Sequence, residues 1–282
     1  MATSKLALNT SLESDPAEKW TVVSRRRGKN RPGLLSFRRG QEVRPWKPSD
    51  RESNGERESK LMRKIKVHLQ NFENSEICSS FLHQLRSPIV WDKLVMKVLG
   101  SDKRRMRMVI YGIGSIEESE YSRSQLSLVL MLKKKFDWIG DIEVFDPVIS
   151  LTESRILKSL GCCVLSVNEQ CRRKAHEPTL FFMPHCEFFM YENLLEENWD
   201  VDRLSNVVLL GNSFSKYYEQ EKSDENALGG SHVFTAATRF TEEVEMSSRF
   251  GVDGESFEPF FALSWHFFHP VSERQLRSSP SA

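Results

Sequence analysis

Residues 106–135 constrain the fold of this chain more than any other stretch. They open with a run of apolar and β-branched residues at 108–111, which is typical of a buried strand. Gly112 and Gly114 follow, and glycine allows a sharp backbone turn because it has no Cβ. Residues 126–130 then supply the apolar face of a helix. This succession of strand, glycine turn and helix predicts the opening unit of a doubly wound α/β fold.

The helix of this unit has recognisable ends. Ser122 followed by Gln125 is a capping-box pattern, in which two side chains satisfy free amides at a helix start. Lys133, Lys134 and Lys135 are placed where the helix dipole favours positive charge. We therefore expect the helix to begin at Ser122 and to end near Lys135.

Short apolar runs alternate with helical patterns through the following residues. Ser150 and Glu153 form a second capping box, and Gly161 stands where a left-handed residue ends that helix. Four further strands are expected at residues 142–145, 162–165, 179–183 and 207–210. Repeated β–α units with short apolar strands predict a Rossmann-like, mostly parallel sheet with flanking helices.

The flanks of this core have their own patterns. Residues 60–99 show a helical period interrupted at Pro88, which predicts a helical segment before the sheet. We expect residues 233–246 to be a strand that passes into an amphipathic segment, and residues 257–268 to add a final antiparallel strand at an edge of the sheet. The α/β domain is then expected to cover residues 59–270, with its core at 106–218 and a flexible tail at 271–282.

The composition of residues 1–58 predicts a disordered basic arm, because the segment is poor in hydrophobic residues and rich in Ser, Arg, Pro and Gly. Its densest basic cluster is a candidate nuclear-import signal, with a solvated linker as the equal alternative. Direct nucleic-acid binding is less favoured, because the aromatic residues of the arm are too far apart to form a stacking platform. The cluster consists of Arg25, Arg26, Arg27, Lys29 and Arg31.

Composition excludes several classes of protein. Lys and Arg total 40 against 39 Asp and Glu, so no global field attracts nucleic acid or a membrane. Five irregularly spaced cysteines argue against a secreted disulfide framework. No apolar run approaches the roughly 18 residues that cross a bilayer, and the first residues lack the apolar core of a secretion signal. We expect an intracellular protein without a membrane partner.

Polar and small residues follow five successive predicted strands. In an open α/β sheet, ligands bind outside the carboxyl ends of the strands, where the strand order reverses. These residues therefore predict a ligand pocket, although strand ends also carry polar residues simply because they meet water. The candidate pocket residues are Gly112, Gly114, Ser115, Asp146, His185, Asn212 and Ser213.

The residues do not identify a cofactor for this pocket. A dinucleotide fingerprint needs a third glycine, and Glu117 stands in its place. Glu117, Glu118 and Glu120 would repel a pyrophosphate unless they point away. Adenosyl-methionine tolerates such a turn better because it is less anionic, and the glycines could also serve only to form a tight turn.

His185 and Cys186 are the remaining candidates for chemistry. Neighbouring residues of an extended strand point to opposite faces, so we expect neither a shared nucleophilic site nor a metal site. His185 is a candidate general acid or base, with a structural hydrogen bond as the favoured alternative. We expect Cys162, Cys163 and Cys186 to be small buried hydrophobic residues.

Several segments match one family in order. Residues 109–115 read VIYGIGS, residues 179–186 read TLFFMPHC, and residues 191–195 read YENLL. With FDP at 145–147 and GNSF at 211–214, these motifs resemble the SRR-like family over residues 106–218. The Arg-rich arm is similar to that of plant members.

The resemblance implies a regulatory role rather than a known reaction. It implies action in phytochrome-B red-light signalling, circadian clock function and flowering time, in nucleus and cytoplasm, with signalling or clock-related proteins as partners. It supplies no established catalytic residue and no cofactor. Two alternatives stay open, a small-molecule transferase of the adenosyl-methionine-dependent methyltransferase type and a nucleic-acid adaptor that uses the basic arm.

Overall fold

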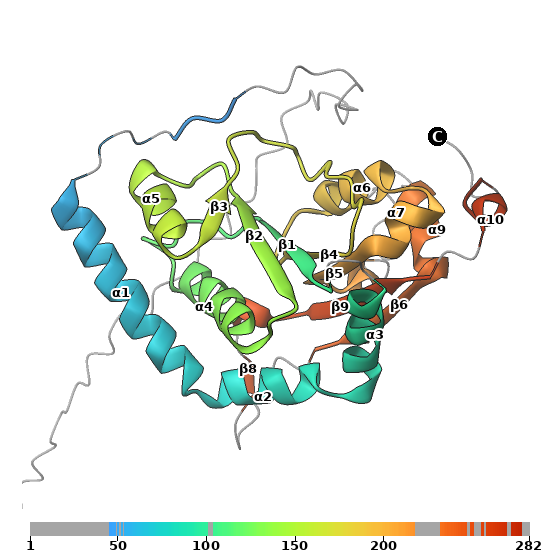
Figure 1. Ribbon diagram of the computed structural model, residues 1–282, viewed down its shortest axis with the longest axis horizontal. Coiled ribbons are helices and arrows are strands. Elements are labelled where there is room, and N and C mark those ends of the chain that lie inside the picture. Colours follow the sequence, from blue (N-terminus) through green and yellow to red (C-terminus); the bar gives the residue numbers. More distant parts are fainter. Residues whose placement is uncertain are drawn as a thin grey trace, which may run out of the picture. The chain divides into compact units, whose positions relative to one another are not determined.

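The computed structural model describes residues 45–48, 50, 52, 54–100, 104–217, 232–246, 249–250, 255–256, 258–269 and 272–277. All of them belong to the compact unit that begins at Val43 (Figure 1). The candidate import cluster at Arg25–Arg31 lies outside the described residues, as does most of the basic arm.

A seven-stranded sheet forms the centre of this unit, with the order β3-β2-β1-β4-β5-β9-β6. The first five strands in this order are parallel, and β9 is antiparallel to both of its neighbours. The predicted α/β fold with a mostly parallel sheet is confirmed. The strands are β1 Met106–Tyr111, β2 Ile139–Phe145, β3 Cys162–Val164, β4 Thr179–Met183, β5 Val207–Asn212, β6 Thr241–Glu245 and β9 Leu263–Phe268. Two short strands, β7 Arg249–Phe250 and β8 Glu255–Ser256, pair separately.

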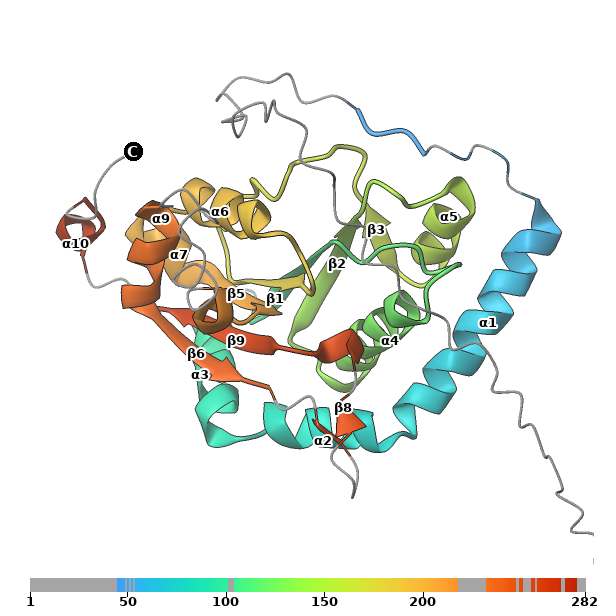
Figure 2. The ribbon, with the colours of Figure 1, turned by 180° about the vertical axis from the view of Figure 1, so that it is seen from behind.

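Helices cover the sheet on both faces, as Figures 1 and 2 show. The helices that pack on one face are α1 Gly55–Glu73, α2 Glu76–Leu85, α3 Pro88–Leu99, α4 Glu120–Lys135 and α5 Leu151–Ser159. The helices that pack on the other face are α6 Phe188–Glu197, α7 Val201–Asn206, α9 His232–Ala237 and α10 Glu273–Arg277. Two 3₁₀ turns, η1 Thr238–Phe240 and η2 Glu258–Phe260, are also present. No helix among the described residues is long and apolar enough to cross a membrane.

Strand β1 explains why the sequence carries uninterrupted apolar runs. Successive side chains of a strand point to opposite faces of the sheet. Met108 and Ile110 therefore belong to the core beneath α1–α5, whereas Val109 and Tyr111 belong to the core beneath α6, α7 and α9. Because both faces are buried, both sets of positions have to be apolar.

Local signals placed most helix ends correctly, with one exception. The box formed by Ser150 and Glu153 is present at the start of α5, and Gly161 is left-handed with φ of 85°. The prediction that Ser122 caps the preceding helix was wrong. Ser119 is the N-cap of α4, and its hydroxyl accepts a hydrogen bond from the Ser122 N–H at 3.2 Å.

The C-terminal region differs from expectation in two ways. Residues 232–237 form the helix α9 and the strand β6 follows it, so the predicted order of strand and amphipathic segment was wrong. The last strand, β9, is antiparallel as predicted, but it lies between β5 and β6 instead of at an edge. All six residues of β9 are buried, whereas the acidic sequence of β6 suits an edge strand.

Described residues outside the predicted domain limits also pack against the domain. The helix α1 begins at Gly55, and the Trp46 backbone N–H donates to the carbonyl of Ser166, just after β3, at 2.7 Å. The Trp46 ring meets Phe145 edge-on, with ring centroids 5.8 Å apart. At the other end, α10 forms within the predicted tail and buries Leu276. Each of these two contacts depends on a single anchoring side chain, Trp46 or Leu276. The average composition of a segment does not reveal such a residue.

Candidate functional site

The strand order reverses between β1 and β4, and the loops at this edge of the sheet form the strand-end rim. We define the rim as residues 112–119, 146–150, 184–187 and 212–213. All seven predicted pocket residues lie in it, because the carboxyl ends of parallel strands share one edge. The structure joins Gly114 to Asp146 in one group and His185 to Asn212 in another, whereas Ser213 lies beside Glu243.

The glycine turn after β1 allows two very close approaches. Gly112 and Gly114 have φ of 72° and 73°, in the left-handed region that favours glycine. A Cβ on Gly112 would lie 2.7 Å from the Cys186 sulfur, and a Cβ on Gly114 would lie 2.9 Å from the Ser122 hydroxyl. The loops after β1 and β4 are therefore in direct contact at the point where the strand order reverses.

Asp146 holds the glycine turn in place. Its Oδ2 accepts a hydrogen bond from the Gly114 N–H at 2.8 Å, and its Oδ1 accepts one from the Val148 N–H at 3.0 Å. The side chain is buried. Both carboxylate oxygens of the predicted ligand-binding aspartate are thus engaged with the backbone of the rim.

Glu153 is a second anchor of the same turn, and it is 1% exposed. Its Oε1 accepts hydrogen bonds from the Ser115 hydroxyl at 2.6 Å and the Glu117 N–H at 3.0 Å. Its Oε2 accepts one from the Ser150 N–H at 2.7 Å, which closes the capping box of α5. One buried carboxylate therefore ties the turn after β1 to the start of α5, a role that the sequence pattern did not reveal.

One acidic residue of the turn, Glu117, is held by an ion pair with α1. Glu117 forms an ion pair with Arg57 of α1 at 2.7 Å, and this pairing lowers the pKa of the Glu117 carboxyl. Arg57 also pairs with Asp50. The carboxylate that stands in place of the third fingerprint glycine is therefore neutralised by α1.

His185 and Asn212 form the second group. His185 has φ of 53°, which is uncommon outside glycine, and its N–H donates to the Asn212 Oδ1 at 2.7 Å. Its ring Nε2 lies 3.2 Å from the Pro259 carbonyl, which also accepts a hydrogen bond from the buried Gln125 at 3.1 Å. Of the two roles considered for His185, this contact corresponds to the structural one.

Two tyrosines complete the environment of Asn212. The Asn212 Nδ2 donates to the Tyr217 hydroxyl at 2.7 Å, and that hydroxyl donates to the Cys186 carbonyl at 2.8 Å. The Asn212 N–H donates to the Tyr191 hydroxyl at 3.0 Å. Burial raises the pKa of both tyrosines, so they remain neutral hydrogen-bonding groups at physiological pH.

The cysteines offer no activated nucleophile at the rim. Burial raises the pKa of the Cys186 thiol to about 12, so the reactive thiolate is not formed near neutral pH. Cys162 and Cys186 are buried as predicted. Cys163 is exposed, contrary to prediction, because it points away from Cys162 in the short edge strand β3. Among the described residues, no three His, Cys, Asp or Glu side chains are grouped so that they could hold a metal ion.

A cavity of about 410 Å³ lies beside the rim, next to the residues that follow β5. Its acidic side chain, Glu243, accepts a hydrogen bond from the Ser215 hydroxyl at 2.8 Å. The fully buried His266 lies behind it, with Nε2 3.8 Å from the Glu243 Oε1, and burial lowers the pKa of His266 to about 4. The cavity is lined by Phe214, Ser215, Thr235, Thr238, Arg239, Thr241 and Glu243.

Sequence reasoning missed this pair because its members are distant in the chain. Glu243 and His266 become neighbours only through the antiparallel pairing of β6 with β9. Ser213, the last predicted pocket residue, is buried beside them. Burial raises the pKa of Glu243, but His266 and then the Ser213 hydroxyl lower it overall.

Comparison with known proteins places the chain in a family. The model of the SRR1 domain matches residues 72–267. The chain belongs to this family. It is 45% identical to Protein SENSITIVITY TO RED LIGHT REDUCED 1 of Arabidopsis thaliana over 277 residues, 95% of this chain and 98% of that protein. It is 32% identical to an SRR1-like protein of Mus musculus over 225 residues, 70% of this chain and 85% of that protein.

Solved structures resemble the SRR1-family chain only distantly. The 23S rRNA methyltransferase ErmE matches with a TM-score of 0.36 and 10% identity, over 66% of this chain and 72% of that protein. Thermoplasma acidophilum 1320 matches with a TM-score of 0.33 and 10% identity, over 75% of this chain and 98% of that protein. Scores this low carry no information about activity.

Proposed function

We propose that this chain is a regulatory protein of red-light signalling that acts through contacts with other proteins. The name of the Arabidopsis relative refers to reduced sensitivity to red light, and the two chains align over nearly their full lengths. We extend the proposal to phytochrome-B signalling, circadian clock function and flowering time, with residence in nucleus and cytoplasm and with signalling or clock-related partners. The import signal would be the cluster from Arg25 to Arg31.

The engagement of Asp146 is the observation that carries this proposal. Both of its oxygens accept hydrogen bonds from the backbone of the rim, and the Cys186 sulfur fills the space beside Gly112. Groups that bind a ligand have to exchange partners at a cost, because a buried donor left without an acceptor is destabilising. A rim whose polar groups already satisfy one another suits a rigid scaffold better than a cofactor site.

A transferase of the adenosyl-methionine-dependent type is the second candidate. A glycine turn follows β1 and an aspartate follows β2, at the edge where open α/β sheets bind ligands. Each oxygen of Asp146 already accepts one backbone hydrogen bond, so a ligand hydroxyl would have to share an oxygen with the Gly114 N–H or the Val148 N–H. The third candidate, a nucleic-acid adaptor, depends on the basic arm alone.

Complementation in plants tests the proposed role. We expect this chain to restore red-light sensitivity to an Arabidopsis line that lacks the relative, scored as growth inhibition under red light. The variant His185→Gly should restore it equally well, because glycine tolerates the positive φ and only the imidazole is removed. Failure of the wild-type chain at normal protein levels would contradict the role. Failure of His185→Gly alone, with the protein folded, would favour a working site at the rim.

A further inference from the structure

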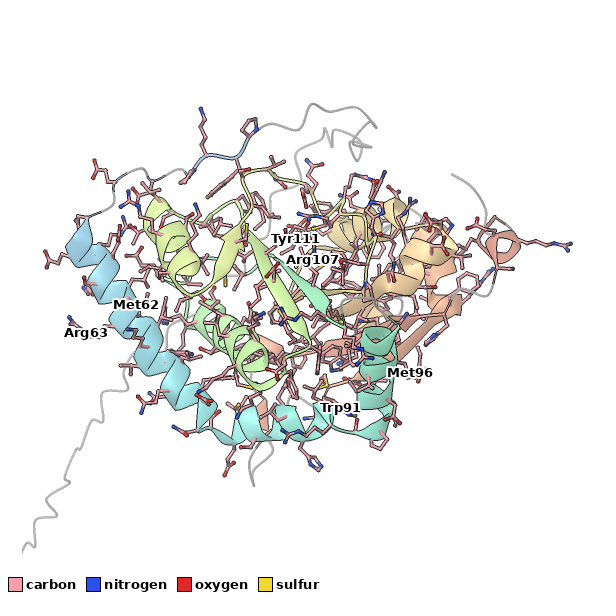
Figure 3. The ribbon with its side chains drawn as sticks, in the orientation of Figure 1. Met62, Arg63, Trp91, Met96, Arg107 and Tyr111 are labelled. Carbon is pink, nitrogen blue, oxygen red and sulfur yellow. The ribbon has the colours of Figure 1, made fainter. Side chains whose placement is uncertain are left out.

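A groove of about 450 Å³ runs between α1 and the start of α4, outside the strand-end rim groups described above. Most of its lining comes from one face of α1, and Arg63 extends outward from that helix (Figure 3). The residues that line the groove are Lys60, Arg63, Lys64, Val67, His68, Asn71, Glu120 and Arg123.

The groove concentrates positive charge in a chain that is nearly neutral overall. Four cationic side chains and one carboxylate give it a net charge of 4 − 1 = +3, compared with +1 for the whole chain. His68 adds no charge at neutral pH, because burial, followed by the nearby Arg123, lowers its pKa. The excess is therefore local and attracts anionic groups.

Arg123 is a buried cation in the lining of the groove. It is 7% exposed, and within the described part of the chain its guanidinium donates to two backbone carbonyls, those of Ile116 at 3.1 Å and Glu117 at 3.2 Å. Burial lowers the pKa of Arg123. Burying a cation is costly, and nearby Glu120 offsets only part of this effect, so a further carboxylate would stabilise Arg123.

In the part of the chain that the structure describes, ion pairs to carboxylates are missing at most cations of the groove. Within the described residues, no carboxylate forms an ion pair with Lys60, Arg63 or Arg123. By contrast, six arginines elsewhere in the described chain do pair with carboxylates. They are Arg57, Arg107, Arg155, Arg172, Arg173 and Arg203. The groove thus gathers three cations with which no carboxylate among the described residues forms an ion pair.

The shape and lining of the groove favour a polypeptide as the occupant. The α1 positions from Lys60 to Asn71 extend about 16 Å along the helix axis. Val67, which is 54% exposed, places an apolar side chain among the cations. The lining contains no Phe, Tyr or Trp on which a base could stack, and single-stranded nucleic acid depends on such stacking.

We propose that the α1–α4 groove binds an acidic segment of a partner protein. Carboxylates of the segment pair with Lys60, Arg63 and Lys64. One further carboxylate, or a backbone carbonyl of the segment, approaches Arg123. An apolar residue of the segment packs on Val67. This inference does not depend on the proposed role in light signalling, because the purified full chain is sufficient to test it.

The test measures fluorescence anisotropy of a labelled peptide of about 12 residues in which glutamate pairs alternate with leucine. A second peptide with glutamine in place of glutamate and a single-stranded oligonucleotide serve as competing probes. Arg63→Glu removes a groove cation. Lys66→Glu is the matched control, because Lys66 is exposed on the same helix but does not line the groove.

We expect the acidic peptide to bind, with affinity that falls as salt rises from about 50 to about 300 mM. Arg63→Glu should weaken binding by at least about tenfold, and Lys66→Glu by less than about twofold. Equal effects of the two variants would overturn the proposal, because they would indicate unspecific surface charge. Tighter, groove-dependent binding of the oligonucleotide, or no binding of the acidic peptide, would also overturn it.

Discussion

Replacing Glu153 by alanine is expected to lower the free energy of unfolding by about 3–5 kcal/mol. The side chain is 1% exposed and accepts hydrogen bonds from the Ser115 hydroxyl, the Glu117 N–H and the Ser150 N–H. Alanine leaves all three donors without that acceptor in a place with little access to water, and it also opens a cavity. The expected loss is a large fraction of the stability of a typical domain.

Two further variants separate this effect from a general effect of charge. Glu153→Gln keeps one acceptor oxygen and should cost clearly less than Glu153→Ala. Glu118→Ala removes an exposed carboxylate from the same turn and should change stability by no more than about 0.5 kcal/mol. Urea unfolding followed by circular dichroism provides the three values. A loss for Glu153→Ala no larger than for Glu118→Ala would show that Glu153 does not anchor the turn.

Replacing Gly112 by alanine is expected to cost roughly 2–4 kcal/mol, in two parts. A left-handed φ of 72° strains any residue that has a Cβ. The new Cβ would also lie 2.7 Å from the Cys186 sulfur, so the loop after β4 has to shift. The cost of this overlap depends on the contact between the loop after β1 and the loop after β4. That contact closes the crevice between these strands.

Gly161 supplies the matched control for this substitution. Its φ is 85°, but a Cβ there meets nothing within 4 Å, so Gly161→Ala should cost only the strain of about 1–2 kcal/mol. The double variant Gly112→Ala, Cys186→Ala lacks the Cys186 sulfur. It should therefore recover the part of the lost free energy of unfolding that is due to the overlap. Thermal unfolding of the set measures both parts. Equal losses for the two glycine variants, with no recovery in the double variant, would contradict the contact.

Local sequence patterns were sufficient to predict most of the fold. The capping box of α5 and the left-handed Gly161 are interactions between residues only a few positions apart, so the sequence displays them directly. The central position of β9 depends instead on pairing with two distant strands, and its aromatic residues fit an edge or a centre equally well. The docking of Trp46 beside Phe145 is non-local in the same way.

The candidate site shows the same division. Topology explains why Gly112, Asp146, His185 and Asn212 share one edge of the sheet, since parallel strands end together. The partners of these residues could not be predicted, because they depend on side-chain directions. Nothing in the sequence shows that the Asp146 carboxylate turns to the Gly114 N–H, or that Glu243 meets His266.

The central claim is that the strand-end rim is a closed scaffold, and ligand-dependent thermal unfolding tests it most directly. The purified chain would be heated with adenosyl-methionine, adenosyl-homocysteine, NAD, NADP, ATP or haem. A ligand at about 100 times its dissociation constant adds roughly 2.7 kcal/mol of stability, which shifts the Tm of a domain of this size by several degrees. We expect no shift with any of them at concentrations up to about 1 mM. A shift with an adenosyl compound that His185→Gly or Asp146→Asn abolishes, in a variant that remains folded, would contradict the claim and favour a transferase.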